Sequence, residues 1–213
     1  SIPFDEPAFT VAGNFRDVDP PAFDIPGFEL IHGSLSGNGT VTFTDRRDPL
    51  ADLEAQVNLG RGHLTEVPFR EGRLELSFHD ETWSIDSLTV TLEAASLRGR
   101  GTVTPSFMDL GFLYVGHLAP WRQFVRQSNL DGTGFLTVGL AGETGKPVLE
   151  ASGLVQQLEI GAVAAPRIEV RNALGTLTQP RDIALDFVAE EGLRVGGLDF
   201  SVGDGKVRIG DDR

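Results

Sequence analysis

The chain has 213 residues, and 31 acidic against 18 basic residues give it a formal net charge of −13. This excess of negative charge disfavours nucleic acid as a partner, because proteins that bind it neutralise phosphates with lysine and arginine. The sequence contains no cysteine, which excludes disulfide bonds, a thiolate nucleophile and a cysteine-based zinc site. It also contains no apolar run of about 18 residues, the length that a membrane-spanning helix needs.

The first 28 residues combine proline and aspartate with five phenylalanines. We interpret 1–28 as the end of a preceding structural unit whose aromatic side chains lie over a sheet. The alternative is a mobile aromatic lid or docking strand. The stretch SIPFDEP lacks the basic and apolar regions of a signal peptide. Because the chain starts at Ser1 and Met108 is its single methionine, we expect it to be a segment of a longer protein.

After the first 28 residues, apolar side chains recur at every second position in many short segments. Clusters of Gly, Pro and Asp separate these segments. A period of two indicates β-strands with one buried and one solvated face. Short connections favour pairing between sequence neighbours, so we predict an all-β fold built as an antiparallel meander. In chain order, the alternating residues are Val41/Phe43, Leu53/Ala55/Val57/Leu59, Leu74/Leu76/Phe78, Leu88/Val90/Leu92, Leu136/Val138/Leu140, Ile168/Val170, Ile183/Leu185/Phe187, Leu198/Phe200/Val202 and Val207/Ile209.

One stretch, LAPWRQFVRQS, departs from this period. Its apolar residues Trp121, Phe124 and Val125 fall at positions i, i+3 and i+4, which is helical spacing. Proline is favoured in the first turn of a helix. We therefore predict one short helix from Pro120 to Gln127.

Two parts of the chain are similar to each other. The segments 36–55 and 131–151 share a G-x-G opening, a strand, a turn, a proline and a closing Leu-Glu-Ala. Similar units that follow one another in a chain are expected to stack into a longer array. We therefore divide the chain after residue 28 into a first unit, 29–117, and a second unit, 118–213, which starts with the short helix.

No motif indicates catalysis. His79, Asp80 and Glu81 carry metal-ligand groups, but three consecutive residues at a hairpin end point in different directions, so we predict a solvated turn. The stretch from Asn129 begins like a calcium loop, yet its twelfth position is Leu140 in place of the bidentate glutamate. The glycine-rich GSLSGNG lacks the GK[ST] ending of a phosphate-binding loop. We predict a non-enzymatic protein with no catalytic residues, no metal ion and no cofactor.

The strand pattern resembles a known family. The segment SNLDGTGFLTVGLAGETGKPVLEASGLVQQLEIG (128–161), with LAPWRQFVRQ before it, and the weaker copy GNGTVTFTDRRDPLADLEAQVNLGRG resemble the AsmA-like superfamily, in particular its TamB-like members. The similarity in strand pattern covers nearly the whole chain from Phe28 onward. It implies a fold in which a long antiparallel sheet curls into a U-shaped β-taco groove with an apolar interior and a polar exterior.

The same resemblance implies a function and a location. Members of the superfamily are bacterial envelope proteins, anchored in the inner membrane, that cross the periplasm and are thought to carry phospholipid acyl chains toward the outer membrane. TamB-like members also act with an Omp85-type outer-membrane barrel in assembling membrane proteins. We therefore expect a periplasmic, bridge-like lipid-transfer segment whose partners are phospholipid, the rest of the same long chain and, as a possibility, such a barrel.

The alternation places one set of apolar side chains on a shared face, where they would form the wall of a lipid groove. Acyl chains need only dry apolar walls, and each buried methylene contributes about 0.8 kcal/mol. About 14 to 16 strands spaced about 4.8 Å apart would give an open sheet roughly 65 to 75 Å long. The candidate wall residues are Val41, Phe43, Val57, Leu74, Leu76, Phe78, Leu88, Val90, Leu136, Val138, Ile168, Val170, Leu185, Phe187, Phe200 and Val202.

Two other readings remain open at this point. A sheet can also hide its apolar face by packing on a second sheet, so the chain could be a β-sandwich binding or adhesion module with closed cores. A β-rich glycan-processing enzyme would need two carboxylates that meet in a cleft, and the pattern of 31 acidic residues singles out no such pair.

Overall fold

The computed structural model describes residues 9–23, 25–26, 32–43, 52–64, 67–122, 129–176, 179–201 and 203–209. Nearly all of this chain is β-structure, which confirms the predicted all-β class. The elements are β1 (Phe9–Val18), η1 (Pro20–Phe23), β2 (Gly33–Phe43), β3 (Asp52–Leu59), β4 (Gly62–Leu64), β5 (Val67–His79), β6 (Thr82–Leu92), β7 (Ala95–Val103), β8 (Phe107–His117), η3 (Ala119–Trp121), β9 (Asp131–Glu143), β10 (Val148–Ile160), β11 (Val163–Thr176), β12 (Gln179–Ala189), β13 (Leu193–Val195), β14 (Leu198–Phe200) and β15 (Gly203–Ile209).

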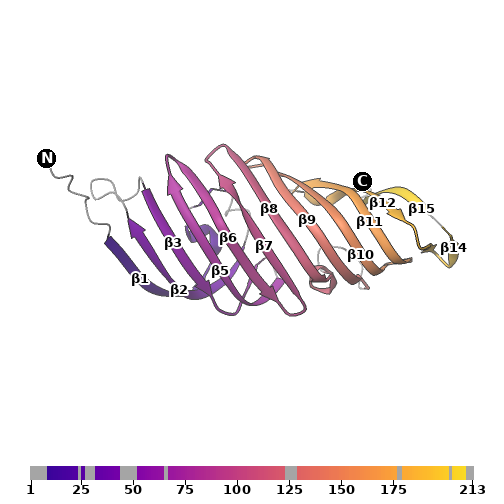
Figure 1. Ribbon diagram of the computed structural model, residues 1–213, viewed down its shortest axis with the longest axis horizontal. Helices are drawn as coiled ribbons and strands as arrows, with labels where there is room; N and C mark the ends of the chain where they lie inside the picture. The colour runs from indigo at the N-terminus through magenta and orange to yellow at the C-terminus, as the bar shows by residue number, and fades with distance from the viewer. Residues whose placement is uncertain are drawn as a thin grey trace.

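The strands form one antiparallel sheet that extends along the molecule (Figure 1). Its 15 strands follow the chain order from β1 to β15, with the short strands β4, β13 and β14 off the main path. The predicted meander is therefore confirmed. β1 and β15 are the two ends of the path, and in the described residues no pairing joins them, so the sheet is open.

Strand register places most of the apolar side chains of the sheet on one face. Directly opposed residues in antiparallel strands point to the same side, so each row of partners can be followed across the sheet. We call this side the apolar face and the other side the polar face. One row consists of Val41, Ala55, Leu76, Ile85, Gly101, Leu110, Leu140 and Leu149. The next consists of Val57, Leu74, Leu88, Gly99, Phe112, Val138, Ala151, Ala173 and Leu185.

Two connecting segments cover parts of the apolar face. Ile25, which follows η1, packs in a buried cluster with Ala55, Leu76 and Ile85. Around η3, the side chains of Leu118, Trp121 and Leu130 belong to a second and larger cluster. The sheet thus buries part of its apolar face against its own connections.

The predicted helix is only partly visible. A 3-10 turn over Ala119–Trp121 stands where the sequence predicts the start of a helix, and Pro120 lies in its first turn. The rest of the prediction, residues 123–127, lies outside the described residues. The ring of Trp121 contacts Tyr114 edge to face, with 5.7 Å between the centroids, so this turn is held by packing on the sheet.

Two glycines on the apolar face combine a positive φ with a close approach of the neighbouring strand's backbone. Gly101 has φ +147°, and a Cβ there would lie 2.1 Å from the carbonyl oxygen of Asp109. Gly153 has φ +143°, and its Cβ would lie 2.1 Å from the carbonyl oxygen of Phe135. Only glycine adopts such φ values without strain, and glycines at such positions let a sheet bend. Both positions are therefore fixed as glycine by the shape of the backbone.

The N-terminal segment joins the same sheet. β1 pairs with β2 from Phe9 opposite Phe43 to Val18 opposite Leu35, and the rings of Phe9 and Phe43 stack with centroids 4.7 Å apart. A short turn also precedes three long strands in both halves of the chain, because η1 precedes β2, β3 and β5 as η3 precedes β9, β10 and β11, although η1 lies before the predicted start of the first unit. Their limits at residues 28 and 117 stay predictions.

Candidate functional site

The predicted wall residues divide into groups by exposure. Five are buried within the hydrophobic clusters: Leu76, Val90, Ile168, Val170 and Phe187. Nine are half-buried: Val41, Phe43, Val57, Leu74, Phe78, Leu88, Leu136, Val138 and Leu185. Phe200 is exposed on β14, and Val202 lies outside the described residues. The half-buried group is the part of the wall that a ligand could touch without displacing the core.

One end of the apolar face is lined with aromatic rings. Phe9 stacks on Phe43, and two strands farther along Phe78 packs on Trp83, with 4.8 Å between the ring centroids. Both pairs lie in one register row, which continues through Leu53 between Phe43 and Phe78. This row gives the strand ends a continuous apolar border.

Sequence reasoning missed Trp83 and Ile85, although both belong to the apolar face. The pairing of β6 with β7 shifts between Ile85 and Leu88, so these two residues are out of phase with the alternation that starts at Leu88. A β-bulge of this kind adds one residue to one strand and changes which positions face inward. The apolar residues at positions 83 and 85, two apart in the sequence, are the signal that could have placed both on the apolar face.

Strand β8 was missed for a different reason. Met108, Leu110, Phe112 and Tyr114 alternate regularly, and register places them on the apolar face. The strand also carries apolar residues on its polar face, so no hydrophobic alternation stands out in its sequence. The pattern of its apolar residues therefore fits a buried strand and a buried helix segment equally well.

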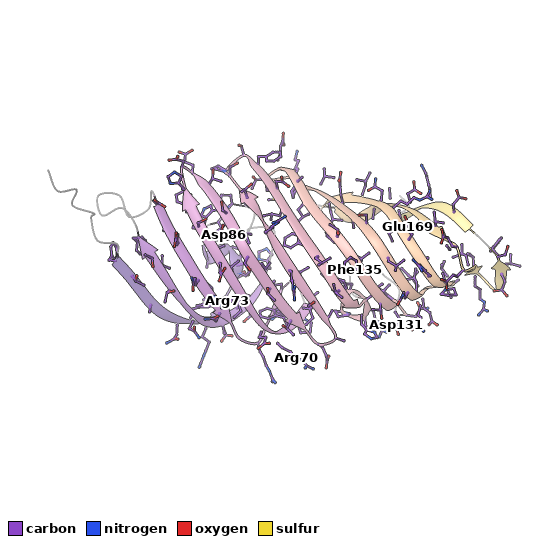
Figure 2. The ribbon with its side chains drawn as sticks, viewed as in Figure 1. Arg70, Arg73, Asp86, Asp131, Phe135 and Glu169 are labelled. Atoms are coloured by element: carbon purple, nitrogen blue, oxygen red, sulfur yellow. The ribbon has the colours of Figure 1, made fainter. Side chains whose placement is uncertain are left out.

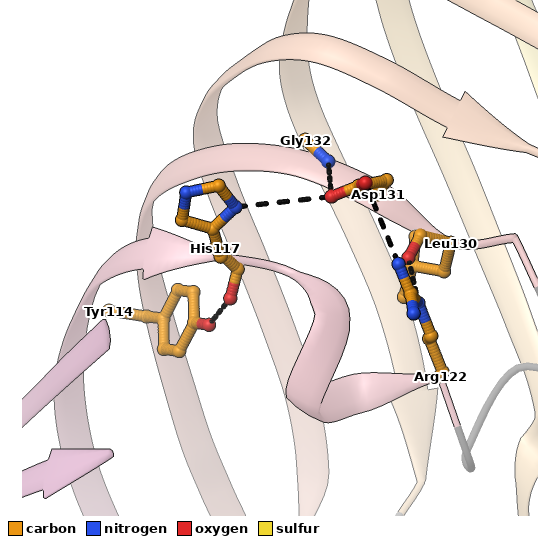
Figure 3. A network of polar contacts seen from close by, with 6 residues as sticks. All are labelled: Tyr114, His117, Arg122, Leu130, Asp131 and Gly132. Atoms are coloured by element: carbon orange, nitrogen blue, oxygen red, sulfur yellow. Dashed lines mark hydrogen bonds and ion pairs between the residues drawn. The ribbon is translucent and has the colours of Figure 1, made fainter. Parts of the chain in front are cut away.

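A network of polar contacts lies beside η3 at one end of the apolar face (Figure 3). The hydroxyl of buried Tyr114 donates a hydrogen bond to the carbonyl oxygen of His117. Burial raises the pKa of the Tyr114 phenol, while its hydrogen bond with Trp121 opposes that shift. The hydrogen bond to His117 fixes the Tyr114 side chain against the last residue of β8.

The same network holds the start of β9. Arg122 donates through Nε to the carbonyl oxygen of Leu130 at 2.6 Å, and its guanidinium lies 3.5 Å from Asp131. Asp131 also accepts a hydrogen bond from the Gly132 N–H at 2.8 Å, and His117 lies 3.9 Å from it. These hydrogen bonds and ion pairs thus hold the backbone at the start of β9.

The segment that begins like a calcium loop also has structural partners. Asn129 accepts from the Gly161 N–H at 2.7 Å and donates to the Gly161 carbonyl oxygen at 2.8 Å. These two bonds connect the start of β9 to the turn between β10 and β11. In the described part of the chain, no group of three His, Cys, Asp or Glu side chains is placed to hold a metal ion.

The hairpin tip between β5 and β6 is a solvated turn, as predicted. Asp80 and Glu81 both have positive φ, +47° and +61°, which is the conformation of a type I′ two-residue hairpin. His79 lies 3.1 Å from Asp80 and 3.9 Å from Asp52, and all three side chains are well exposed. Exposed ion pairs of this kind contribute little to stability.

A cavity of about 960 Å³ lies at the C-terminal end of the molecule. The ends of β8 to β11 and the β13–β14 hairpin surround it. Three of its lining residues, Leu158, Ala165 and Leu193, also belong to the larger hydrophobic cluster, so the cavity adjoins the apolar face. Arg194 and Asp199 form an ion pair at 2.8 Å on its border, and this pair raises the pKa of Arg194.

Comparisons with known proteins found no match among family models, curated proteins or solved structures. None of the helices in the described residues is long and apolar enough to cross a membrane.

Proposed function

We propose that this chain is a non-enzymatic lipid-transfer segment that holds phospholipid acyl chains along its apolar face. The apolar face would form the wall of a U-shaped groove of the β-taco type. The half-buried side chains of the wall, such as Val57, Leu74 and Val138, would contact the acyl chain. The headgroup would remain in water at the border of the sheet.

The observation that supports this proposal most strongly is the continuity of the apolar face. Register rows of apolar residues and glycines extend across consecutive strands from β2 to β10, and the row through Val57 and Leu74 reaches β12. A stripe that crosses strand after strand suits a ligand that is long, apolar and without fixed hydrogen-bonding groups. At about 0.8 kcal/mol per methylene, a chain of ten buried methylenes would gain roughly 8 kcal/mol before ordering costs.

The location and partners of the proposed segment follow from the resemblance. We place it in the periplasm, as part of an envelope protein anchored in the inner membrane that bridges toward the outer membrane. Its neighbours would be further parts of the same chain, and an Omp85-type barrel is the proposed partner in outer-membrane biogenesis. The open ends of the sheet at β1 and β15 are compatible with continuation into adjacent strands.

Native mass spectrometry of the purified chain tests the proposal. We expect adducts with the mass of phospholipids that are lost when the half-buried wall is made polar, for instance by Leu74→Asn together with Val138→Asn. The matched control carries Arg73→Asn and Thr137→Asn, one position away on the polar face. A wild-type chain that folds and carries no lipid from a bacterial envelope would contradict the proposal.

A β-sandwich binding or adhesion module is the second candidate. It would need separate sheets packed face to face, whereas the described strands belong to one sheet. Small-angle scattering distinguishes the two, because a compact chain of this length has a radius of gyration of about 17 Å. A clearly larger radius is expected for the extended sheet.

A further inference from the structure

The polar face carries an apolar row that the proposed lipid function does not use. Val115 on β8, Phe135 on β9 and Leu154 on β10 are direct register partners. Val115 is 39% exposed and Phe135 is 53% exposed. Figure 2 shows Phe135 on the central strands of the sheet, between the labels of Arg73 toward one end and Glu169 toward the other. Elsewhere on this face, the corresponding rows of β2, β3 and β5 consist of Thr, Asn, Gln, Ser, Glu and Arg.

On strands β7 to β10, a second row has charged side chains on the two outer strands and no side chain on the two inner strands. Across these strands it consists of Arg100, Gly111, Gly139 and Glu150, and on β11 it continues with Leu174. A Cβ built on Gly139 would meet no atom within 4 Å, so the space above the two glycines is open. Arg100 and Glu150 are exposed, and in the described residues neither has an ion-pair partner.

Two copies of this surface could pair with each other through these two rows. Consider a two-fold axis that runs parallel to the strands, between β8 and β9, and relates two copies of the chain. Each row of one copy would then pack on the same row of the other copy in reversed order. Arg100 of one copy would then face Glu150 of the other, and Val115 would face Phe135, each contact occurring twice. Gly111 would face Gly139, which allows close approach at the axis. Symmetric dimers use such isologous surfaces, and aligned sheets pack face to face in this way.

We propose that the polar face of β7 to β10 is a docking surface for a second copy of this chain. The apolar contact of Val115 with Phe135 would form the centre, and the two Arg100–Glu150 ion pairs would fix the register of the two sheets. Charge complementarity favours a second copy as the occupant, because the opposite charges of Arg100 and Glu150 stand at positions that the two-fold axis exchanges. The surface lies on the opposite side of the sheet from the proposed lipid wall, so the two proposals stand or fall separately.

Sedimentation equilibrium of the purified chain, with charge-reversal variants, tests this proposal. The wild type is expected to dimerise, and Arg100→Glu or Glu150→Arg alone is expected to raise the dimer dissociation constant at least about tenfold, because like charges then meet twice. A chain with both reversals should dimerise again. An equimolar mixture of the two single variants should form a mixed dimer, since every charged contact in it is again attractive.

The controls separate docking from folding and from exposure. Phe135→Glu should also abolish the dimer, whereas Val11→Glu, at an equally exposed apolar residue on β1, should leave it intact. Thermal unfolding of all variants, measured at a concentration at which the wild type is monomeric, should match the wild type, because the changed side chains are exposed and dimerisation adds no stability there. A wild type that remains monomeric into the high-micromolar range, or single reversals that dimerise as tightly as wild type, would overturn the proposal. So would capture of a different protein by this surface while the wild type stays monomeric.

Discussion

The centre of the apolar face and its N-terminal edge carry the same kinds of side chain in very different environments. Val103 on β7 is 1% exposed, whereas Val11 on β1 is 53% exposed, although register places both on the apolar face. Val103 has strands on both sides and lies in the cluster that Ile25 covers. Val11 has a strand on one side only. Alternation thus determines the face of a side chain, and its neighbours determine its burial.

The largest effect is expected from a charge at the centre. Val103→Asp would bury a carboxylate without a partner, which we expect to cost more than about 4 kcal/mol of unfolding free energy and to prevent folding. Thr102→Asp, at the adjacent exposed position on the polar face opposite Asp109, should cost less than about 1 kcal/mol. Chemical denaturation followed by circular dichroism measures both, and equal losses would contradict the assignment of the two faces.

A large effect is also expected where the backbone requires glycine. In Gly153→Ala, the new Cβ would collide with the carbonyl oxygen of Phe135 at a φ that alanine avoids, at a cost of about 2 to 4 kcal/mol. Gly13→Ala on edge strand β1 provides the control, because its Cβ would meet no atom within 4 Å. Chemical denaturation measures both variants. A Gly153→Ala variant as stable as the wild type would show that β9 and β10 can move apart at this position.

A smaller effect is expected at the connection that covers the face. Asp19 accepts a hydrogen bond from the Gly33 N–H at 2.8 Å and lies 3.2 Å from His32. The Gly33 hydrogen bond, and then His32, hold the pKa of Asp19 below its ordinary value. Because the folded pKa is depressed, this stabilisation is present at neutral pH and is lost as the pH falls through the folded pKa. Asp19→Asn should therefore lower the melting temperature slightly at pH 7 and have no effect at strongly acidic pH. A deficit that persists in acid would contradict this reading.

The smallest effect is expected at the edge. Val11→Asp leaves the new carboxylate in water, so we expect a loss within about 0.5 kcal/mol. Val11→Asp and Val103→Asp form a matched pair, because the replaced residue, the substitution and the face of the sheet are the same and only the burial differs. A loss above about 2 kcal/mol at Val11 would show that the edge of the apolar face is covered in solution.

The sequence predicted the all-β class, the meander order, many of the strands and most of the apolar face, because period two and short connections are local signals. It could not predict the segments that cover this face, since the packing of Ile25 on Leu76 and of Trp121 on Tyr114 joins distant parts of the chain. The wall residues Trp83 and Ile85 were lost through a shift of register at a bulge. The row from Val115 to Phe135 depends on the pairing of β8 with β9, which no single strand reveals.

Site-specific photo-crosslinking in bacterial cells tests the central claim most directly. A photoreactive residue at Val138, half-buried on the apolar face of β9, is compared with one at Thr137, the preceding residue, which faces the other side. If the apolar face holds acyl chains, the probe at Val138 should capture phospholipid and the probe at Thr137 should not. Equal capture at both positions, or capture at neither in a folded and correctly located chain, would contradict the account.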